Sequence, residues 1–200
     1  MIPNIEHLPY LYPLEPTRYI LIAAFIIQGL GLLIAGYRLS GSGIAAWGDH
    51  TIGKFWFLSG KIGLFTSWTL CLVKAIVPRM GWYQTPFLMA VAGTIVLCLG
   101  TFVLVVAFFG LKNSLRVGLP KEETSLITSG IYAWSRNPIY LGVFMICIAS
   151  MLYFPDPVNI VLAVYGIVIH YRITLGEERF LEQRFGEEWD AYRQKVRRYM

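Results

Sequence analysis

The chain has 200 residues, of which 56% are hydrophobic, 15% aromatic and only 14% charged, and its formal net charge is +5. A soluble domain carries roughly 25% charged residues, so this composition excludes an ordinary soluble fold and indicates an integral membrane protein. The basic balance fits cytoplasmic loops that meet anionic headgroups. We see no basic patch of the kind that a nucleic-acid-binding domain needs.

Cysteine and histidine are too scattered to predict a disulfide framework or a metal site. The three histidines lie far apart and share no ligand spacing, so we predict no metal. The three cysteines lie inside apolar runs and are interpreted as small buried residues: Cys71, Cys98 and Cys147.

The first half of the chain predicts an interfacial segment and three transmembrane helices. Residues 1–18 are rich in proline and tyrosine, which argues against a regular helix and favours the membrane interface. Apolar runs of bilayer length follow at about 19–37, 55–77 and 87–111.

Two features within these spans suggest specific roles. Gly31 and Ala35 indicate a small-residue face for close helix packing in the first span. The second span carries Lys61, and an ionisable residue within a span is a functional candidate. Lys61 is only two turns from the start of that span, so snorkelling to the interface explains it equally well.

The second half begins with a polar stretch and continues with two short apolar runs. Residues 112–135 are polar, and the runs 139–154 and 158–171 are joined by Pro155-Asp156-Pro157. Both runs are short for a span. The joint is too tight for anything but a helical hairpin, so we interpret the runs as a fourth and a fifth transmembrane helix.

From Glu177 onward the chain is amphipathic. Apolar residues recur at steps of three and four, which predicts one face of a helix with a possible break at Gly186: Leu181, Phe185, Trp189, Tyr192, Val196 and Tyr199. The last residues are basic and are expected to touch anionic lipid: Arg193, Lys195, Arg197 and Arg198.

The predicted fold is therefore all-α and integral to the membrane, with about five transmembrane helices, a C-terminal helical hairpin and an amphipathic cytosolic tail helix. Lysine and arginine gather in the 112–136 loop and in the tail. The positive-inside rule then predicts that the C-terminus faces the cytoplasm.

The stretch 129–142 combines features that suit a binding site. The step Asn137-Pro138 predicts a helix start, because proline is tolerated in the first turn and pushes the residue before it out of the helical region. A helix start offers unpaired N–H groups to an anion. By itself the stretch is equally well explained as a capped membrane helix with interfacial tyrosines and a snorkelling arginine.

Two blocks carry a resemblance to a known family. One is Gly130-Ile-Tyr132 followed by Arg136-Asn137-Pro138-Ile-Tyr140-Leu-Gly142, and the other contains Arg172, Glu177-Glu178, Phe185-Gly186, Trp189 and Tyr192. Together, on either side of a helical hairpin, they resemble the isoprenylcysteine carboxyl methyltransferases and the related phospholipid methyltransferases. The resemblance covers about residues 111–198.

This resemblance implies an S-adenosylmethionine-dependent methyltransferase that is embedded in the membrane and acts on a lipophilic acceptor. The implied division is an N-terminal part, residues 1–111, and a methyltransferase core, residues 112–200. The implied cofactor-binding residues are Gly130, Tyr132, Arg136, Asn137, Pro138, Tyr140, Glu177 and Glu178.

The implied chemistry assigns two further roles. Arg172 would orient an acceptor carboxylate, whereas a lipid amine would need a base, for which Glu178 or its neighbour is the candidate. Many relatives have histidine at the position of Asn137, and asparagine cannot titrate near neutrality, which argues against proton transfer there. Methyl transfer from an activated donor needs chiefly alignment and exclusion of water.

Several alternatives stay open at this point. The acceptor can be a prenylated cysteine, a phospholipid headgroup or a smaller lipophilic acid or amine, and the oligomeric state is unknown. The rival functions are an NADPH-dependent reductase on a related membrane scaffold and a non-enzymatic membrane subunit in which Lys61 is the functional charge.

Overall fold

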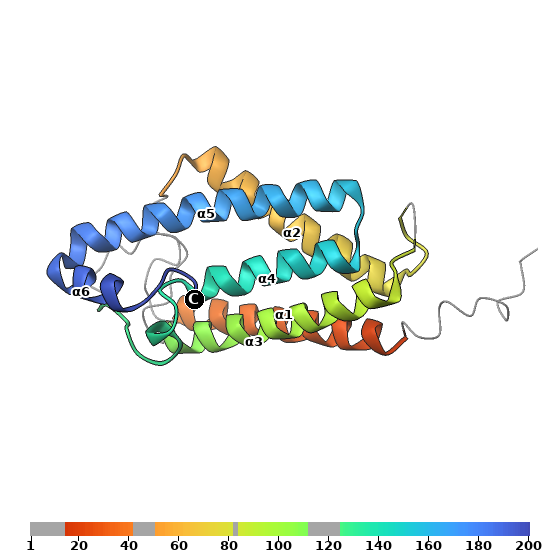
Figure 1. The fold of residues 1–200 in the computed structure, drawn as a ribbon, viewed down its shortest axis with the longest axis horizontal. Helices are drawn as coiled ribbons and strands as arrows, with labels where there is room; N and C mark the ends of the chain where they lie inside the picture. Colours follow the sequence, from red (N-terminus) through yellow and green to blue (C-terminus); the bar gives the residue numbers. More distant parts are fainter. Residues whose placement is uncertain (1–14, 42–50, 82–83, 112–124) are drawn as a thin grey trace, which may run out of the picture.

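The computed structural model describes residues 15–41, 51–81, 84–111 and 125–200, and within these ranges the regular elements are all helical (Figure 1). The five long helices are α1 (Glu15–Gly41), α2 (Lys54–Ile76), α3 (Phe87–Leu111), α4 (Pro138–Tyr153) and α5 (Pro157–Phe185). A 3-10 turn, η4 (Gly130–Ala133), precedes α4, and the short helix α6 (Glu187–Lys195) follows α5.

The bundle has the outer surface of a membrane protein. Helices α2, α3 and α5 are long and apolar enough to cross a bilayer, whereas the apolar stretch of α1, Pro16–Gly31, and α4 are shorter. Large apolar side chains are exposed on several helices, including Leu33, Leu88 and Phe102. Such a surface suits lipid chains better than water.

Successive long helices run in alternate directions, so their connections gather at two ends of the bundle (Figure 1). At one end the Thr85 hydroxyl donates to the Tyr153 carbonyl at 2.8 Å and ties the α2–α3 turn to the α4–α5 turn. The predicted hairpin is confirmed: Asp156 caps α5 by accepting from the Val158 N–H at 3.0 Å. The opposite end holds η4, the start of α4, and α6.

The predicted fifth span and the first half of the predicted tail helix are one continuous helix, α5. The boundary placed between them was wrong because Ile173 and Thr174 are buried against the bundle and keep the helix regular. The predicted break at Gly186 is confirmed, with a positive φ of 49° that favours glycine. Of the predicted apolar face, Trp189 and Tyr192 are buried, whereas the remaining residues are partly buried and divided between α5 and the tail: Leu181, Phe185, Val196 and Tyr199.

Close helix packing occurs mainly between α3 and α4. A Cβ added at Gly142 would lie 2.9 Å from the Gly100 carbonyl oxygen and 3.0 Å from the Leu104 backbone nitrogen. The packing face predicted in α1 does not pack against another described helix at Gly31, where an added Cβ would meet no described residue within 4 Å. The side chain of Ala35 lies outside the described residues.

Buried polar side chains join three helices in the interior of the bundle. The Ser67 hydroxyl of α2 donates to the Asn159 side-chain oxygen of α5 at 2.8 Å and lies 3.0 Å from the Ser150 hydroxyl of α4. Asn159 donates in turn to the Phe154 carbonyl at 2.8 Å. Because every one of these groups is buried, the network favours one register of α2 against the hairpin.

Substitution of Gly142 by alanine should destabilise the protein by about 1–3 kcal/mol, the usual cost of overpacking, because backbone atoms of α3 occupy the space for a Cβ. Gly29→Ala in α1 is the matched control, since no atom of the described part of the chain lies within 4 Å of its added Cβ. Thermal unfolding in detergent measures both variants. Equal midpoints would contradict the close approach of α3 and α4.

Candidate active site

The segment after α6 returns to the start of α4 and pairs with it. The Arg136 N–H donates to the Arg197 carbonyl at 3.0 Å, and the Asn137 N–H donates to the Arg198 carbonyl at 3.1 Å. The Ser135 hydroxyl also donates to the Arg198 carbonyl, at 3.1 Å. The C-terminus is thereby fixed beside the first turn of α4 (Figure 1).

Glu178 of α5 binds three side chains at this junction. One carboxylate oxygen accepts from Arg136 Nε and Nη2, both at 3.2 Å, and from Asn137 Nδ2 at 2.7 Å. The other accepts from Arg198 Nε and Nη2 at 3.0 and 2.8 Å. These bonds raise the pKa of the Arg198 guanidinium above its ordinary value. We call Glu178, Arg136, Asn137 and Arg198 the Glu178 clamp.

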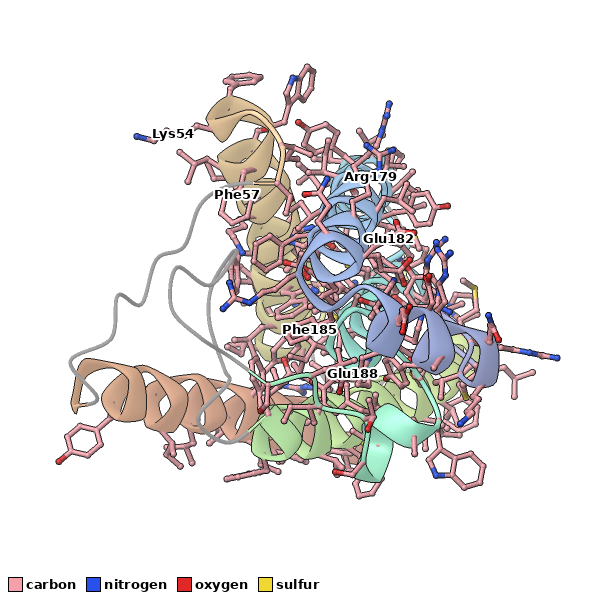
Figure 2. The ribbon with its side chains drawn as sticks, turned by 90° about the vertical axis from the view of Figure 1, so that its left-hand side faces the viewer. Lys54, Phe57, Arg179, Glu182, Phe185 and Glu188 are labelled. Carbon is pink, nitrogen blue, oxygen red and sulfur yellow. The ribbon has the colours of Figure 1, made fainter. Side chains whose placement is uncertain are left out.

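Helix α6 completes the clamp from the outside. Figure 2 looks onto this end of the bundle, where α5 passes Phe185 and turns into α6, which carries Glu188. Arg136 Nη1 donates to the Arg193 and Val196 carbonyls at 3.0 and 2.8 Å, which satisfies acceptors at the C-terminal end of α6. The Arg136 guanidinium also lies 5.7 Å from the centre of the Trp189 ring.

A second contact anchors α6 to η4. The Tyr192 hydroxyl donates to the Tyr132 carbonyl. Burial raises the pKa of Tyr192 to about 12, so the phenol stays protonated and remains a donor at neutral pH. The Tyr132 ring is buried as well, and its hydroxyl lies 3.4 Å from the Ala107 carbonyl of α3.

Glu177 faces a different environment from its neighbour. It accepts a hydrogen bond of 2.7 Å from the Tyr140 hydroxyl and interacts electrostatically with Lys61 of α2. The Tyr140 ring lies 6.2 Å from the His170 ring and 6.4 Å from the Phe144 ring. Glu177 is therefore an acidic group beside an aromatic wall on the inner side of the clamp.

Tyr199 extends this aromatic wall from the tail. Its ring packs edge-on against Phe144 at 5.5 Å. Its hydroxyl is buried and lies near Thr174 without forming a well-directed hydrogen bond to any described residue. Because a buried hydroxyl without a partner is costly, this atom suits a polar group of a ligand.

The structure brings together five of the eight residues predicted to bind a cofactor. Arg136, Asn137 and Glu178 form the clamp, whereas Tyr140 and Glu177 lie inside it. Pro138 is buried in the first turn of α4, as the sequence predicted.

Gly130 and Arg172 lie apart from this group, whereas Tyr132 borders it, because its carbonyl accepts from the Tyr192 hydroxyl and its phenol interacts electrostatically with Glu177. Gly130 is exposed and has a positive φ of 63°, which glycine adopts readily at the start of η4. Tyr132 points to α3. Arg172 is exposed on α5 and, among the described residues, makes no hydrogen bond or ion pair with Glu178, to which Arg136 and Arg198 are bound. Its role toward an acceptor carboxylate stays a prediction.

The sequence did not predict Arg198 and Tyr199 as residues of the site, and the lipid contact predicted for Arg193 stays a prediction. Of the four cations expected to touch lipid, Arg198 binds Glu178 and Arg193 binds Glu182 at 2.8 Å. The signal in the sequence that could have identified them is the pair Arg198-Tyr199, which follows an aromatic helix face. The paired acidic residues upstream could have suggested carboxylate partners for the basic end.

Removing the charge of Glu178 should open the clamp. Glu178→Gln leaves two guanidinium groups without their carboxylate, and we expect a loss of about 3 kcal/mol, typical of a broken buried ion pair. Glu182→Gln is the control, because its pair with Arg193 is nearly half exposed and worth about 0–1 kcal/mol. Thermal unfolding and limited proteolysis after residue 186 measure both effects, and equal behaviour of the two variants would contradict the clamp.

The stability of the protein should depend on residue 137, because its side chain donates a hydrogen bond to Glu178. Asn137→Asp replaces the N–H that Glu178 accepts by a second carboxylate, so it should destabilise more than Asn137→His, which keeps a donor. The like-charge repulsion raises the carboxyl pKa, so the deficit is present at neutral pH and shrinks as the pH falls through that pKa. Unfolding midpoints at pH 7 and pH 5 test this. A deficit that grows toward acid would be the opposite result.

Comparisons with known proteins agree with the motif blocks. The sequence profile described as phospholipid methyltransferase matches residues 88–188, which includes α3 and all of α4 and α5. The protein-S-isoprenylcysteine O-methyltransferase of Saccharomyces cerevisiae is 30% identical over 114 residues, which are 54% of this chain and 47% of the relative. The enzyme of the same name from Rattus norvegicus is 29% identical over 112 residues, 54% of this chain and 39% of the relative.

A third similar protein is the protein-S-isoprenylcysteine O-methyltransferase of Homo sapiens, 35% identical over 78 residues, 38% of this chain and 28% of the relative. The matched part therefore spans about half or less of each relative's own length. The profile covers half of the chain and includes both motif blocks as far as Glu188. The chain belongs to the phospholipid methyltransferase family, a family of membrane methyltransferases, as the paired blocks predicted.

Proposed function

We propose that the protein is an S-adenosylmethionine-dependent methyltransferase that methylates the carboxyl group of an isoprenylcysteine-like acceptor within the membrane. The observation that carries the proposal is the arrangement inside the Glu178 clamp, where Glu177, Tyr140 and Tyr199 form an acidic and aromatic site. The names of the relatives support O-methylation. The family match favours methyl transfer over an NADPH-dependent reductase or a non-enzymatic subunit.

The residues of this site fit the cofactor. S-adenosylmethionine carries a sulfonium cation, an amino group, a carboxylate and ribose hydroxyls, and when bound it supplies an electrophilic methyl group. Glu177 can attract the cationic groups or accept from the hydroxyls. The rings of Tyr140, Phe144 and Tyr199 can stack on the adenine or face the cation. The Tyr199 hydroxyl, which forms no well-directed hydrogen bond with a described residue, offers a polar contact.

The clamp residues act on this site indirectly. Glu178 is held by five N–H groups, which stabilises it as an anion and suits it to fix the tail rather than to accept a proton. Arg136 is likewise occupied by Glu178 and by carbonyls of α6 and the tail. We therefore assign Arg136, Asn137 and Glu178 to building the pocket, and Glu177, Tyr140 and Tyr199 to contacting the cofactor.

A carboxylate acceptor requires no base, because its oxygen attacks as the anion. The second candidate is N-methylation of a phospholipid amine, which the description of the family favours. That reaction needs a proton acceptor, and Glu177 is the carboxylate with the fewer hydrogen bonds among the described residues.

In the proposed topology the chain crosses the membrane five times. The site lies on the cytoplasmic side, and the start of α1 lies on the opposite side. Lys54, Arg172, Arg179, Lys195 and Arg197 are all exposed at the end that holds the clamp, which fits the positive-inside rule. The opposite end carries Arg79, Arg18, whose guanidinium donates to the Ala75 carbonyl, and Lys74, whose ammonium donates to the Pro78 and Met80 carbonyls.

Calorimetry of S-adenosylmethionine binding in lipid nanodiscs tests the cofactor site. We expect Glu177→Gln to weaken binding more than tenfold and Tyr199→Phe to weaken it about fivefold, the value of one hydrogen bond. Glu187→Gln, an exposed change at the start of α6, should have no effect. Unaltered binding by a folded Glu177→Gln variant would refute the assignment.

Transfer of a labelled methyl group tests the acceptor. With N-acetyl-S-farnesylcysteine present, the label should appear as an alkali-labile methyl ester. Label found instead in the headgroup of a phospholipid amine would favour the second candidate, and binding of NADPH without binding of S-adenosylmethionine would favour the reductase.

A further inference from the structure

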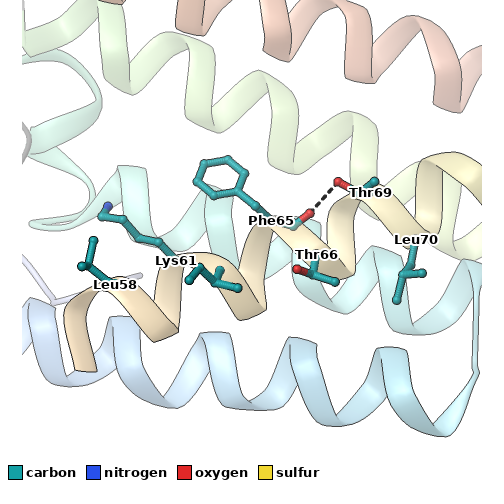
Figure 3. A pocket seen from close by; sticks show the side chains of 7 residues that line it. Leu58, Lys61, Phe65, Thr66, Thr69 and Leu70 are labelled. Carbon is teal, nitrogen blue, oxygen red and sulfur yellow. Dashed lines mark hydrogen bonds between the residues drawn. The ribbon is translucent and has the colours of Figure 1, made fainter. Parts of the chain in front are cut away.

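Lys61 lies where an open groove meets the candidate active site. The groove has a volume of about 420 Å³ and is lined by residues of α2: Leu58, Lys61, Ile62, Phe65, Thr66, Thr69 and Leu70. Figure 3 shows these side chains along one stripe of α2, with the Lys61 side chain extended toward the start of the helix.

The groove opens to the outside of the bundle and is mainly apolar. Leu58, Ile62 and Phe65 are 40%, 66% and 47% exposed, and Thr66 and Thr69 are exposed too. The Thr69 hydroxyl donates to the Phe65 carbonyl at 2.8 Å, so it presents little free polarity to the groove. An apolar stripe of this kind on a membrane helix suits a hydrocarbon chain that approaches through the bilayer.

Lys61 is the charged residue of the lining and is half-buried. Its ammonium lies 4.6 Å from the centre of the Phe57 ring, and the described residues accept no hydrogen bond from it. The titratable groups that interact with it are Glu177 and His170 of α5. Tyr140 lies beside both of them. Lys61 therefore connects the groove to the inner side of the clamp.

The Lys61 ammonium donates to none of the described residues, and its electrostatic interaction with Glu177 leaves its N–H donors free to bind a second anion. The same charge repels a cationic headgroup. A lipophilic acid whose hydrocarbon chain lies along Leu58, Ile62 and Phe65 would place its anionic end at Lys61. The charge of this one residue then makes a lipophilic acid bind more tightly than a lipophilic amine.

We propose that this groove is the binding site of the methyl acceptor and that Lys61 binds the acceptor's carboxylate. The inference rests on the proposed function for the fate of that carboxylate, but binding of the acid does not require the cofactor. Lys61 is then the residue that selects for O-methylation.

The test measures binding of N-acetyl-S-farnesylcysteine and of its methyl ester, which lacks the charge, to the full chain in nanodiscs without cofactor. The parent should bind the acid at least tenfold more tightly than the ester. Lys61→Met should abolish this preference, Lys61→Arg should retain it, and Lys54→Met should leave it unchanged, because Lys54 is an exposed lysine of the same helix outside the groove.

A preference for the acid that survives in Lys61→Met, or the lack of any preference in the parent, would overturn the proposal. A photoreactive group on the farnesyl chain gives a test that needs no variant, since it should label Leu58, Ile62 or Phe65, and labelling confined to other helices would also overturn it. If the parent prefers the acid but does not bind S-adenosylmethionine, the proposed function is refuted, whereas the groove remains assigned as a binding site for the acid.

Discussion

The ion pairs of Glu178 are the interaction on which the arrangement of the site depends. This buried carboxylate joins α5 to the start of α4 through Arg136 and Asn137, and to the C-terminal tail through Arg198. These segments are far apart in the sequence, and a carboxylate can be buried among them because both of its oxygens are bound by charged or amide donors. Without it, the tail that carries Tyr199 keeps the backbone pairing at residues 136–137, the bond from the Ser135 hydroxyl and the bonds from Arg136 to carbonyls of α6 and the tail.

Two adjacent glutamates can serve different purposes because neighbours on a helix point about 100° apart. Glu178 faces the tail and builds the clamp, whereas Glu177 faces Tyr140 and Lys61 on the inner side. The continuous helix α5 carries both from the bilayer to the end of the bundle, and its packing on α2 and α4 sets their direction. Glu177 of α5 therefore links the proposed cofactor site to Lys61 of α2, and through Lys61 to the groove.

The hairpin, the helix start at Pro138 and the break at Gly186 could be predicted from the sequence, because proline and glycine restrict the backbone locally. The family could be predicted because two motif blocks stand in a fixed order. The partners of the motif residues could not be predicted from the sequence, since Arg198 and Tyr199 reach the site only when the tail folds back. The glycines that bring α3 and α4 together were also missed, because periodicity does not say which small residues face a neighbour.

The most direct test of the account is a structure of the protein in nanodiscs with S-adenosylhomocysteine bound. We expect the ligand inside the clamp, with its polar groups at Glu177 and Tyr199 and with the pairs of Glu178 to Arg136 and Arg198 unbroken. A ligand bound elsewhere on the bundle, or one that contacts Glu178 directly in place of the two arginines, would contradict it.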